Sequence, residues 1–317
     1  DSWLSNLQDW CISRQRFWGI PLPIWQSKDG DIILIGSKAE LEQLSGKKVD
    51  DLHRPWIDAI EITKDCKKYT RVPDVLDVWL DSGAAPWATL DYPSKNGMLE
   101  KLGVPDLILE GKDQIRGWFN SLTALSMVSF GRIPFKAVYM HGFINDSQGR
   151  KFSKSLKNGV SPYEVIDTNG ADTLRLYTIG GAQPGQDLNY NPEDVKTRAK
   201  TLIVLWNLHN YVLDLADQLN QNPAKMDDAE MLSQLDIEER YLFSRINSST
   251  KRVTELFEEF KLNDVPSTVE QLTMDLSRVY IQLVREKASG TDEERAVVLY
   301  ASFNALSATL LLSGYVA

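Results

Sequence analysis

The sequence predicts an α/β protein whose second part is entirely helical, on the strength of three observations. Residues 107–141 show a strand–helix–strand pattern, and residues 24–72 contain short β-type segments separated by turn residues. From residue 195 onward, apolar residues recur only at helical spacing. We therefore expect part of a parallel sheet with a small β-rich insertion, followed by an all-α bundle.

The first element expected is a helix over residues 3–18. Apolar residues recur there at helical spacing, and Gly19, Pro21 and Pro23 enforce an extended exit. Because this pattern begins at once and without an initiator methionine, we expect a chain cut out of a longer polypeptide.

The central pattern comprises a strand at Leu107–Glu110, a helix at Gln114–Phe130 and a strand at Ala137–His141. Two strands joined in this way by a helix pair in parallel, with a right-handed crossover. Ligands of such sheets bind beyond the carboxyl ends of the strands, which here are Glu110-Gly111 and His141-Gly142-Phe143.

The helical part is expected to begin with a long amphipathic helix. Its apolar stripe would comprise Leu202, Leu205, Trp206, His209, Val212, Leu213 and Ala216, with His209 as a core histidine. Three further helices are expected over residues 236–260, 265–288 and 291–313. Pro266 suits the first turn of the second of these.

Composition is that of an ordinary globular protein, with 43% hydrophobic and 25% charged residues in a chain of 317, which is enough for two domains. The apolar run at residues 306–317 is shorter than the ~20 residues of a membrane span. A net charge of −9 argues against binding nucleic acid by overall charge. We expect neither a DNA nor a membrane partner.

Two basic clusters could still bind RNA locally. The first comprises Lys196, Arg198 and Lys200, and the second Arg150, Lys151, Lys154 and Lys157. Taken alone, each cluster is more often a solvated surface charge run.

The two cysteines, Cys11 and Cys66, lie far apart, without a CxxC pair or a histidine cluster. This spacing indicates neither a zinc site nor a disulfide framework. Both are expected to be buried as small hydrophobic residues, in a reducing cytoplasm. The first ten residues are polar and acidic, unlike a signal peptide.

The most specific local feature is the loop Gly149–Leu156. Lys151, Lys154 and the Ser153 hydroxyl supply mobile positive charge and a donor, which suits a polyphosphate whose charge shifts during reaction. An exposed basic turn has the same composition, so the loop alone leaves both interpretations open.

A second feature is the segment Glu110–Phe119. Glu110, Gln114 and Trp118 recur every four residues and would share one face, which suits a small zwitterion with an apolar side chain. A helix cap with a core tryptophan is the alternative. Further along, Asp172 is expected to cap or charge a helix start.

In order along nearly the whole chain, these segments resemble the class I aminoacyl-tRNA synthetases and, within them, the isoleucyl family. Lys151–Ser155 is similar to the KMSKS loop, with Phe152 in place of methionine, and Trp10–Gly19 resembles the ISRQRFWG segment. Three segments resemble isoleucyl patterns more than valyl or leucyl ones: Asp74–Gly83, Glu110–Phe119 and, in an archaeal form, Leu52–Pro55.

The resemblance implies a catalytic domain over residues 1–194 and a helical anticodon-binding domain over residues 195–317. The first would be the second half of a Rossmann-type parallel sheet, with its insertion at 24–72 and a KFSKS loop at 149–157. The ligands implied are isoleucine, tRNA(Ile) and ATP with Mg²⁺, with no zinc in this segment.

The resemblance also implies roles for single residues. Isoleucine and its adenylate would bind at Trp18, Glu110, Gly111, Asp113, Gln114 and Trp118. ATP would bind at His141, Gly142, Phe143 and Lys154. The catalytic residues Lys151, Ser153 and Lys154 would stabilise the phosphates while the isoleucine carboxylate attacks and pyrophosphate leaves.

The chain departs from the family in three respects. The HIGH sequence and the editing insertion are absent, so we expect the chain alone neither to activate isoleucine efficiently nor to hydrolyse valyl-tRNA. Lys157 stands where the family usually has glycine.

Three alternatives remain. The first is a valyl or leucyl enzyme, and the second is a non-catalytic RNA-binding module, against which Lys151 and Lys154 argue. The third is a nucleotide-binding oxidoreductase, whose glycine fingerprint the sequence lacks.

Overall fold

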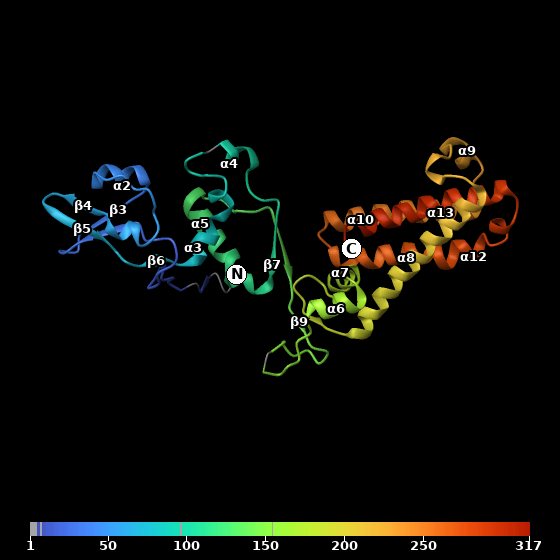
Figure 1. Cartoon of the computed structure of the whole chain (residues 1–317), viewed down its shortest axis with the longest axis horizontal. Coiled ribbons are helices and arrows are strands. Elements are labelled where there is room, and N and C mark those ends of the chain that lie inside the picture. Colours follow the sequence, from blue (N-terminus) through green and yellow to red (C-terminus); the bar gives the residue numbers. More distant parts are fainter. Residues whose placement is uncertain (1–4, 7, 96, 154) are drawn as a thin grey trace. The chain divides into compact units, whose positions relative to one another are not determined.

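The structure, a computed structural model, describes residues 5, 6, 8–95, 97–153 and 155–317. Its residues form two compact units (Figure 1). The first unit comprises residues 1–108 and 113–138, and the second comprises residues 109–112 and 139–317.

The β-rich insertion expected at residues 24–72 is a four-stranded antiparallel sheet of the first unit, blue in Figure 1. Its elements are β2 (Ile24–Ser27), β3 (Ile32–Leu34), helix α2 (Lys38–Ser45), β4 (Glu61–Lys64) and β5 (Lys67–Arg71), with the strands in the order β3-β2-β5-β4. Trp25, Leu41 and Ile62 are at most 1% exposed and form its core. Alternating side chains thus give a small sheet a buried face of its own.

The helix expected over residues 3–18 is wrong for the described residues 8–18. Ser13–Arg14 instead form a short strand, β1, which pairs antiparallel with β6 (Val75–Leu76). An ion pair between Arg14 and Asp77 and a hydrogen bond from Asp77 N to Ile12 O reinforce this pairing. These partners, distant in sequence, outweigh the local helical spacing. The other helices of this unit are α3 (Val78–Ala88), α4 (Gly97–Leu102) and α5 (Trp118–Phe130).

The predicted strand–helix–strand pattern is present. Strands β7 (Leu107–Gly111) and β8 (Ala137–His141) form a two-stranded sheet. Main-chain hydrogen bonds from residue 136 to 105 and from 137 to 106 advance in the same direction, as in a parallel pair. The intervening helix begins at Trp118 rather than at residue 114, because Lys112–Arg116 form a 3-10 helix.

The remainder of the second unit is mainly a helical bundle, yellow to red in Figure 1. Its helices are α6 (Pro162–Asn169), α7 (Ala171–Gly180), α8 (Pro192–Leu219), α9 (Asp228–Ser233), α10 (Ile237–Glu258), α11 (Val265–Met274), α12 (Ile281–Leu283) and α13 (Asp292–Ser313). A π-helix (Asp275–Tyr280) joins α11 to α12, and β9 (Ile144–Asn145) pairs in parallel with β10 (Leu188–Asn189). Pro266 lies in the first turn of α11, as predicted.

Helix α13 is the core helix of this bundle. It is the one described helix long and apolar enough to cross a membrane, but 61% of its most apolar window is buried inside the unit. Its own Leu299 is fully buried, in one cluster with the fully buried Leu242 of α10 and Leu276 of the π-helix. The predicted α/β unit followed by an all-α bundle is therefore confirmed.

Two predictions about the buried face of α8 are wrong. On α8, Trp206 and Leu213 are 66% and 48% exposed, because the buried face runs through Leu208 and Leu215 instead. His209 is half-buried, with its ring 5.8 Å from that of Trp206, and is not a core histidine.

Both cysteines are exposed, contrary to expectation. Cys66 lies in the turn of the β4–β5 hairpin, with φ of 58°. Cys11 precedes β1, and its thiol lies 3.5 Å from the Ser13 hydroxyl, a contact that lowers the pKa of the thiol.

Candidate functional site

Main chain packs closely around the end of β8, in the second unit. A Cβ on Gly142 would lie 1.9 Å from the carbonyl oxygen of Gln186 and 2.7 Å from the amide nitrogen of Asp187, so no other residue fits. The next amide, Phe143 N, donates to Asp187 Oδ1 at 2.8 Å. Glycine therefore allows the chain to turn directly out of the strand and present the Phe143 side chain.

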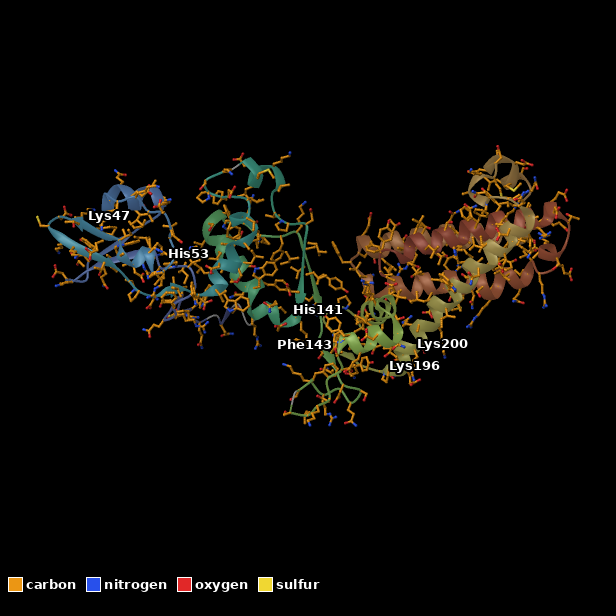
Figure 2. All side chains as sticks on the ribbon, in the orientation of Figure 1. Lys47, His53, His141, Phe143, Lys196 and Lys200 are labelled. Atoms are coloured by element: carbon orange, nitrogen blue, oxygen red, sulfur yellow. The ribbon has the colours of Figure 1, made fainter. Side chains whose placement is uncertain are left out.

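Two lysines lie close to the Phe143 ring. The Lys112 and Lys151 Nζ atoms lie 5.5 and 5.6 Å from its centroid. Asp187 holds Lys112 at 2.6 Å, and hydrogen bonds from Lys112 and from Phe143 N lower the pKa of its carboxyl. An aromatic ring with two ammonium groups nearby suits a nucleotide, whose base can pack beside the ring while the cations meet its phosphates. Figure 2 labels His141 and Phe143 in this corner.

A cavity of about 430 Å³ opens beside this corner, within the second unit. Its lining includes His141, Gly142 and Phe143 from the end of β8, and Thr178 and Ile179 from α7. Pockets of this size and largely apolar character commonly hold small ligands. The structure thus brings the three residues predicted to border ATP to one wall of a cavity.

The loop that carries Lys151 and Ser153 is anchored by a buried acid. Asp146, 7% exposed, accepts hydrogen bonds from the main-chain amides of Gln148 and Arg150 and from the side chains of Arg150 and Asn158. The bond from Asn158 and those from Arg150 and Gln148 hold the pKa of its carboxyl far below its usual range. Lys154, the third predicted catalytic residue, lies outside the described residues.

Asn158 ties the far end of this loop to the same acid. Its Oδ1 accepts from Ser153 N at 2.9 Å, while its Nδ2 donates to Asp146 at 2.8 Å and lies 3.3 Å from Lys151 O. Lys157, beside it, has φ of 48°, a left-handed conformation that glycine adopts more easily. This explains in backbone terms why a glycine suits the position.

Asp113, Gln114 and Trp118 cluster in the first unit. The Gln114 side chain accepts from Trp118 N at 2.9 Å and donates to Asp113 at 3.1 Å, and the Trp118 indole donates to Ser82 O at 2.8 Å. The expectation that Glu110 shares a helical face with Gln114 and Trp118 is wrong, because Glu110 belongs to strand β7.

The remaining predicted positions divide between the units. Trp18, in the first unit, is 79% exposed, and Glu110 and Gly111 lie at the end of β7 in the second unit. Asp172 charges the first turn of α7, where it pairs with Arg175 at 2.6 Å, but Gly170 rather than Asp172 is the N-cap.

The predicted basic cluster on α8 is partly neutralised by ion pairs. Lys196 pairs with Glu193 at 2.7 Å, and Arg198 pairs with Glu270. The hydrogen bond from Lys196 and the charges of Lys196 and Lys200 lower the pKa of the Glu193 carboxyl; Figure 2 labels both lysines.

Sequence reasoning missed Lys112, Asp187, Asp146 and Asn158. The sequence could have indicated Lys112, because this lysine directly follows strand β7. The other three act through contacts between loops, which no local pattern reveals.

Comparison with known proteins matches two families. Residues 1–191 match the tRNA synthetases class I (I, L, M and V), and residues 239–313 match the anticodon-binding domain of tRNA ligases. The chain is 42% identical to the isoleucine–tRNA ligase of Methanothrix thermoacetophila, over 98% of the chain and 30% of that relative. It is 43% identical to that of Methanosarcina barkeri over 90% of the chain and 27% of the relative. The chain thus spans about 30% of the length of these relatives.

Solved structures show the same fold at lower identity. A LeuRS-tRNA-LeuAMS ternary complex from Agrobacterium radiobacter K84 matches 97% of the chain and 41% of its own, with a TM-score of 0.67 and 22% identity. Mycobacterium tuberculosis methionyl-tRNA synthetase with methionyl-adenylate matches 88% and 54%, with a TM-score of 0.64 and 21% identity.

Proposed function

Because the chain belongs to the class I tRNA synthetases of the isoleucine, leucine, methionine and valine group, we propose that it acts within an isoleucine–tRNA ligase. The isoleucine carboxylate attacks the α-phosphorus of ATP, supplied as its Mg²⁺ complex, and pyrophosphate leaves. The 3′ hydroxyl of tRNA(Ile) then takes the acyl group from the adenylate, and AMP leaves. Identities of 41–43% to archaeal isoleucine–tRNA ligases support isoleucine as the amino acid.

The observation that carries this proposal is the Phe143 ring at the end of β8, with the ammonium groups of Lys112 and Lys151 close to it. ATP packs its base toward His141, Gly142 and Phe143, and the lysines meet the phosphates. As negative charge moves to the leaving pyrophosphate, Lys151, Ser153 and Lys154 stabilise it. Isoleucine and its adenylate bind at Trp18, Glu110, Gly111, Asp113, Gln114 and Trp118.

The division of labour we propose follows the chain. Residues 1–194 form the catalytic part, and residues 195–317 bind tRNA through local basic groups, since the overall charge of −9 repels RNA. A location in the cytoplasm, where tRNA is charged, fits this role.

The test is amino-acid-dependent ATP–pyrophosphate exchange by the protein that contains this chain, with isoleucine, valine and leucine compared. We expect a preference for isoleucine and a loss of about 10²–10³-fold in rate for Lys151→Ala, as for removal of a group that stabilises transition-state charge. Lys47→Ala, an exposed lysine of the first unit (Figure 2), is the control for loss of one charge.

Other outcomes would change the assignment. Preference for valine or leucine would keep the family and overturn isoleucine as the substrate. Loss of exchange with tRNA binding intact would replace the enzyme with a non-catalytic RNA-binding module.

A further inference from the structure

A polar groove lies between α10 and α11 in the helical bundle, remote in sequence from the KFSKS loop. Its volume is about 400 Å³, and its lining consists of Arg245, Ser248, Ser249 and Arg252 from α10 and Ser267, Thr268 and Gln271 from α11. Ser267 and Thr268 already donate their hydroxyl hydrogens to Asp264 O, so the donors left to the groove belong to the other five side chains, and no carboxylate is among the seven. In a chain with a net charge of −9, this concentration of donors points to an anion.

Helical spacing explains why the α10 residues converge. Positions 245, 248, 249 and 252 are related as i, i+3, i+4 and i+7, so they follow one face of the helix. The two arginines are therefore about two turns, or ~10 Å, apart along the axis, with the serines between them. A tetrahedral oxyanion at the serines would meet one guanidinium from each side.

One arginine is already oriented for such a ligand. Asp275, 4% exposed, accepts from Arg245 Nε at 2.7 Å through one oxygen and from Gln271 at 3.0 Å through the other. Since the carboxylate engages Nε, the two terminal nitrogens of Arg245 have no hydrogen-bond partner among the described residues. A guanidinium fixed in this way loses little entropy when it binds a phosphate.

Ser249 supplies an independent indication. It is only 5% exposed and lines the groove, yet its hydroxyl has no hydrogen-bond partner within the part of the chain that the structure describes. The hydroxyl is not among the fully buried polar atoms that lack a partner, so it opens into the groove, where a phosphate oxygen can accept its hydrogen bond. Arg252, whose contact with Glu255 is as long as 3.6 Å, can turn toward the same point.

We propose that this groove binds a backbone phosphate of RNA. The proposal rests on the function proposed above, because an RNA ligand is favoured by the position of the groove within residues 239–313, which match the anticodon-binding family. Phosphate oxygens are also the main target of arginine and serine in protein–nucleic acid contacts. The groove would fix the position of the RNA without reading its sequence.

The test measures the binding of a fluorescein-labelled tRNA(Ile) transcript to the 317-residue chain by fluorescence anisotropy. Binding is compared at KCl concentrations from about 50 to about 200 mM. We expect Arg252→Gln to weaken binding about tenfold, as for loss of a charged hydrogen bond, and to reduce the slope of log K against log salt by about 0.7–0.9. Ser249→Ala should weaken binding without lowering the unfolding midpoint.

Lys251→Gln is the matched control, because it removes the same charge from the neighbouring position of α10 and does not line the groove. Equal effects of Arg252→Gln and Lys251→Gln would overturn the proposal while leaving tRNA binding intact. If the unaltered chain binds no tRNA, the proposed function of the bundle falls as well.

A calorimetric titration with inorganic phosphate distinguishes the source of the anion. If phosphate binds the unaltered chain and not Arg252→Gln, while tRNA affinity is the same for both, the groove takes free phosphate and the RNA assignment is wrong. Phosphate binding much weaker than that of tRNA, with both lost in Arg252→Gln, supports it.

Discussion

At Gly142 the neighbouring atoms belong to main chain, which cannot rotate away as a side chain can. We expect Gly142→Ala to cost about 1–3 kcal/mol in the free energy of unfolding, as in other overpacked sites, because the Cβ would meet Gln186 O at 1.9 Å. The bond from Phe143 N to Asp187 should also break, so affinity for ATP should fall. Urea unfolding and ATP titration measure the two effects.

The matched control for that prediction is Gly97→Ala, where a Cβ would meet nothing within 4 Å. Stability there should be unchanged or slightly higher. An unfolding free energy for Gly142→Ala equal to that of the control would show that the corner can relax.

Lys157 offers the opposite case at the scale of one residue, since its φ of 48° disfavours any side chain with a Cβ. Lys157→Gly should relieve about 1–2 kcal/mol of backbone strain, and the added entropy of the unfolded chain should cost about 0.4–1 kcal/mol, so the net gain in the free energy of unfolding is about 0–1.6 kcal/mol. Lys47→Gly, at an exposed lysine outside the left-handed region, should instead lower stability. Urea unfolding of the two variants shows whether their changes in the free energy of unfolding have opposite signs.

At the scale of an element, the KFSKS loop depends on the charge of Asp146. The pKa of this carboxyl is lower in the folded chain than in the unfolded one, so its contribution to stability is present above about pH 4 and is lost as pH falls further. Asp146→Asn should therefore accelerate hydrogen exchange at the Ser153 amide at neutral pH. The difference from the unaltered chain should narrow in acid.

Asp167→Asn, an exposed acid on α6, provides the comparison for loss of one negative charge, and it should leave exchange at Ser153 unchanged. A difference for Asp146→Asn that stays constant between neutral pH and about pH 3 would mean that the charge of the acid does not anchor the loop.

Elements with strong local patterns were predictable, and those defined by distant partners were not. β8 lies at Ala137–His141 as its apolar run indicated, and α13 follows its predicted range closely because both ends carry clear boundary residues. The segment around Arg14 has helical spacing too, but its pairing with β6 and Asp77 determines its structure. For the same reason the sequence indicates Lys151 and Phe143 as site residues. Asp146 and Asp187 are recognised only from the contacts between loops in the folded chain.

At the scale of the whole molecule, the two units have separate cores. The sheet core around Ile62 and the bundle core around Leu299 share no residue. Leu299→Ala removes a fully buried side chain from α13 and should cost about 2–5 kcal/mol in the second unit. We expect hydrogen exchange in α8, α10 and α13 to accelerate accordingly, while protection of β2–β5 stays unchanged, because subglobal unfolding follows cooperative units.

Ile62→Ala is the reciprocal variant, since it should expose the amides of β2–β5 and leave those of the bundle protected. If the two sites are independent, the effects of the double variant on stability should add to within about 0.5 kcal/mol. Loss of protection in both units from either single substitution would show instead that the chain unfolds as one cooperative whole. One free energy of unfolding would then govern both units. A substitution in either core would lower activity by unfolding the whole chain, including the nucleotide corner and the helical bundle.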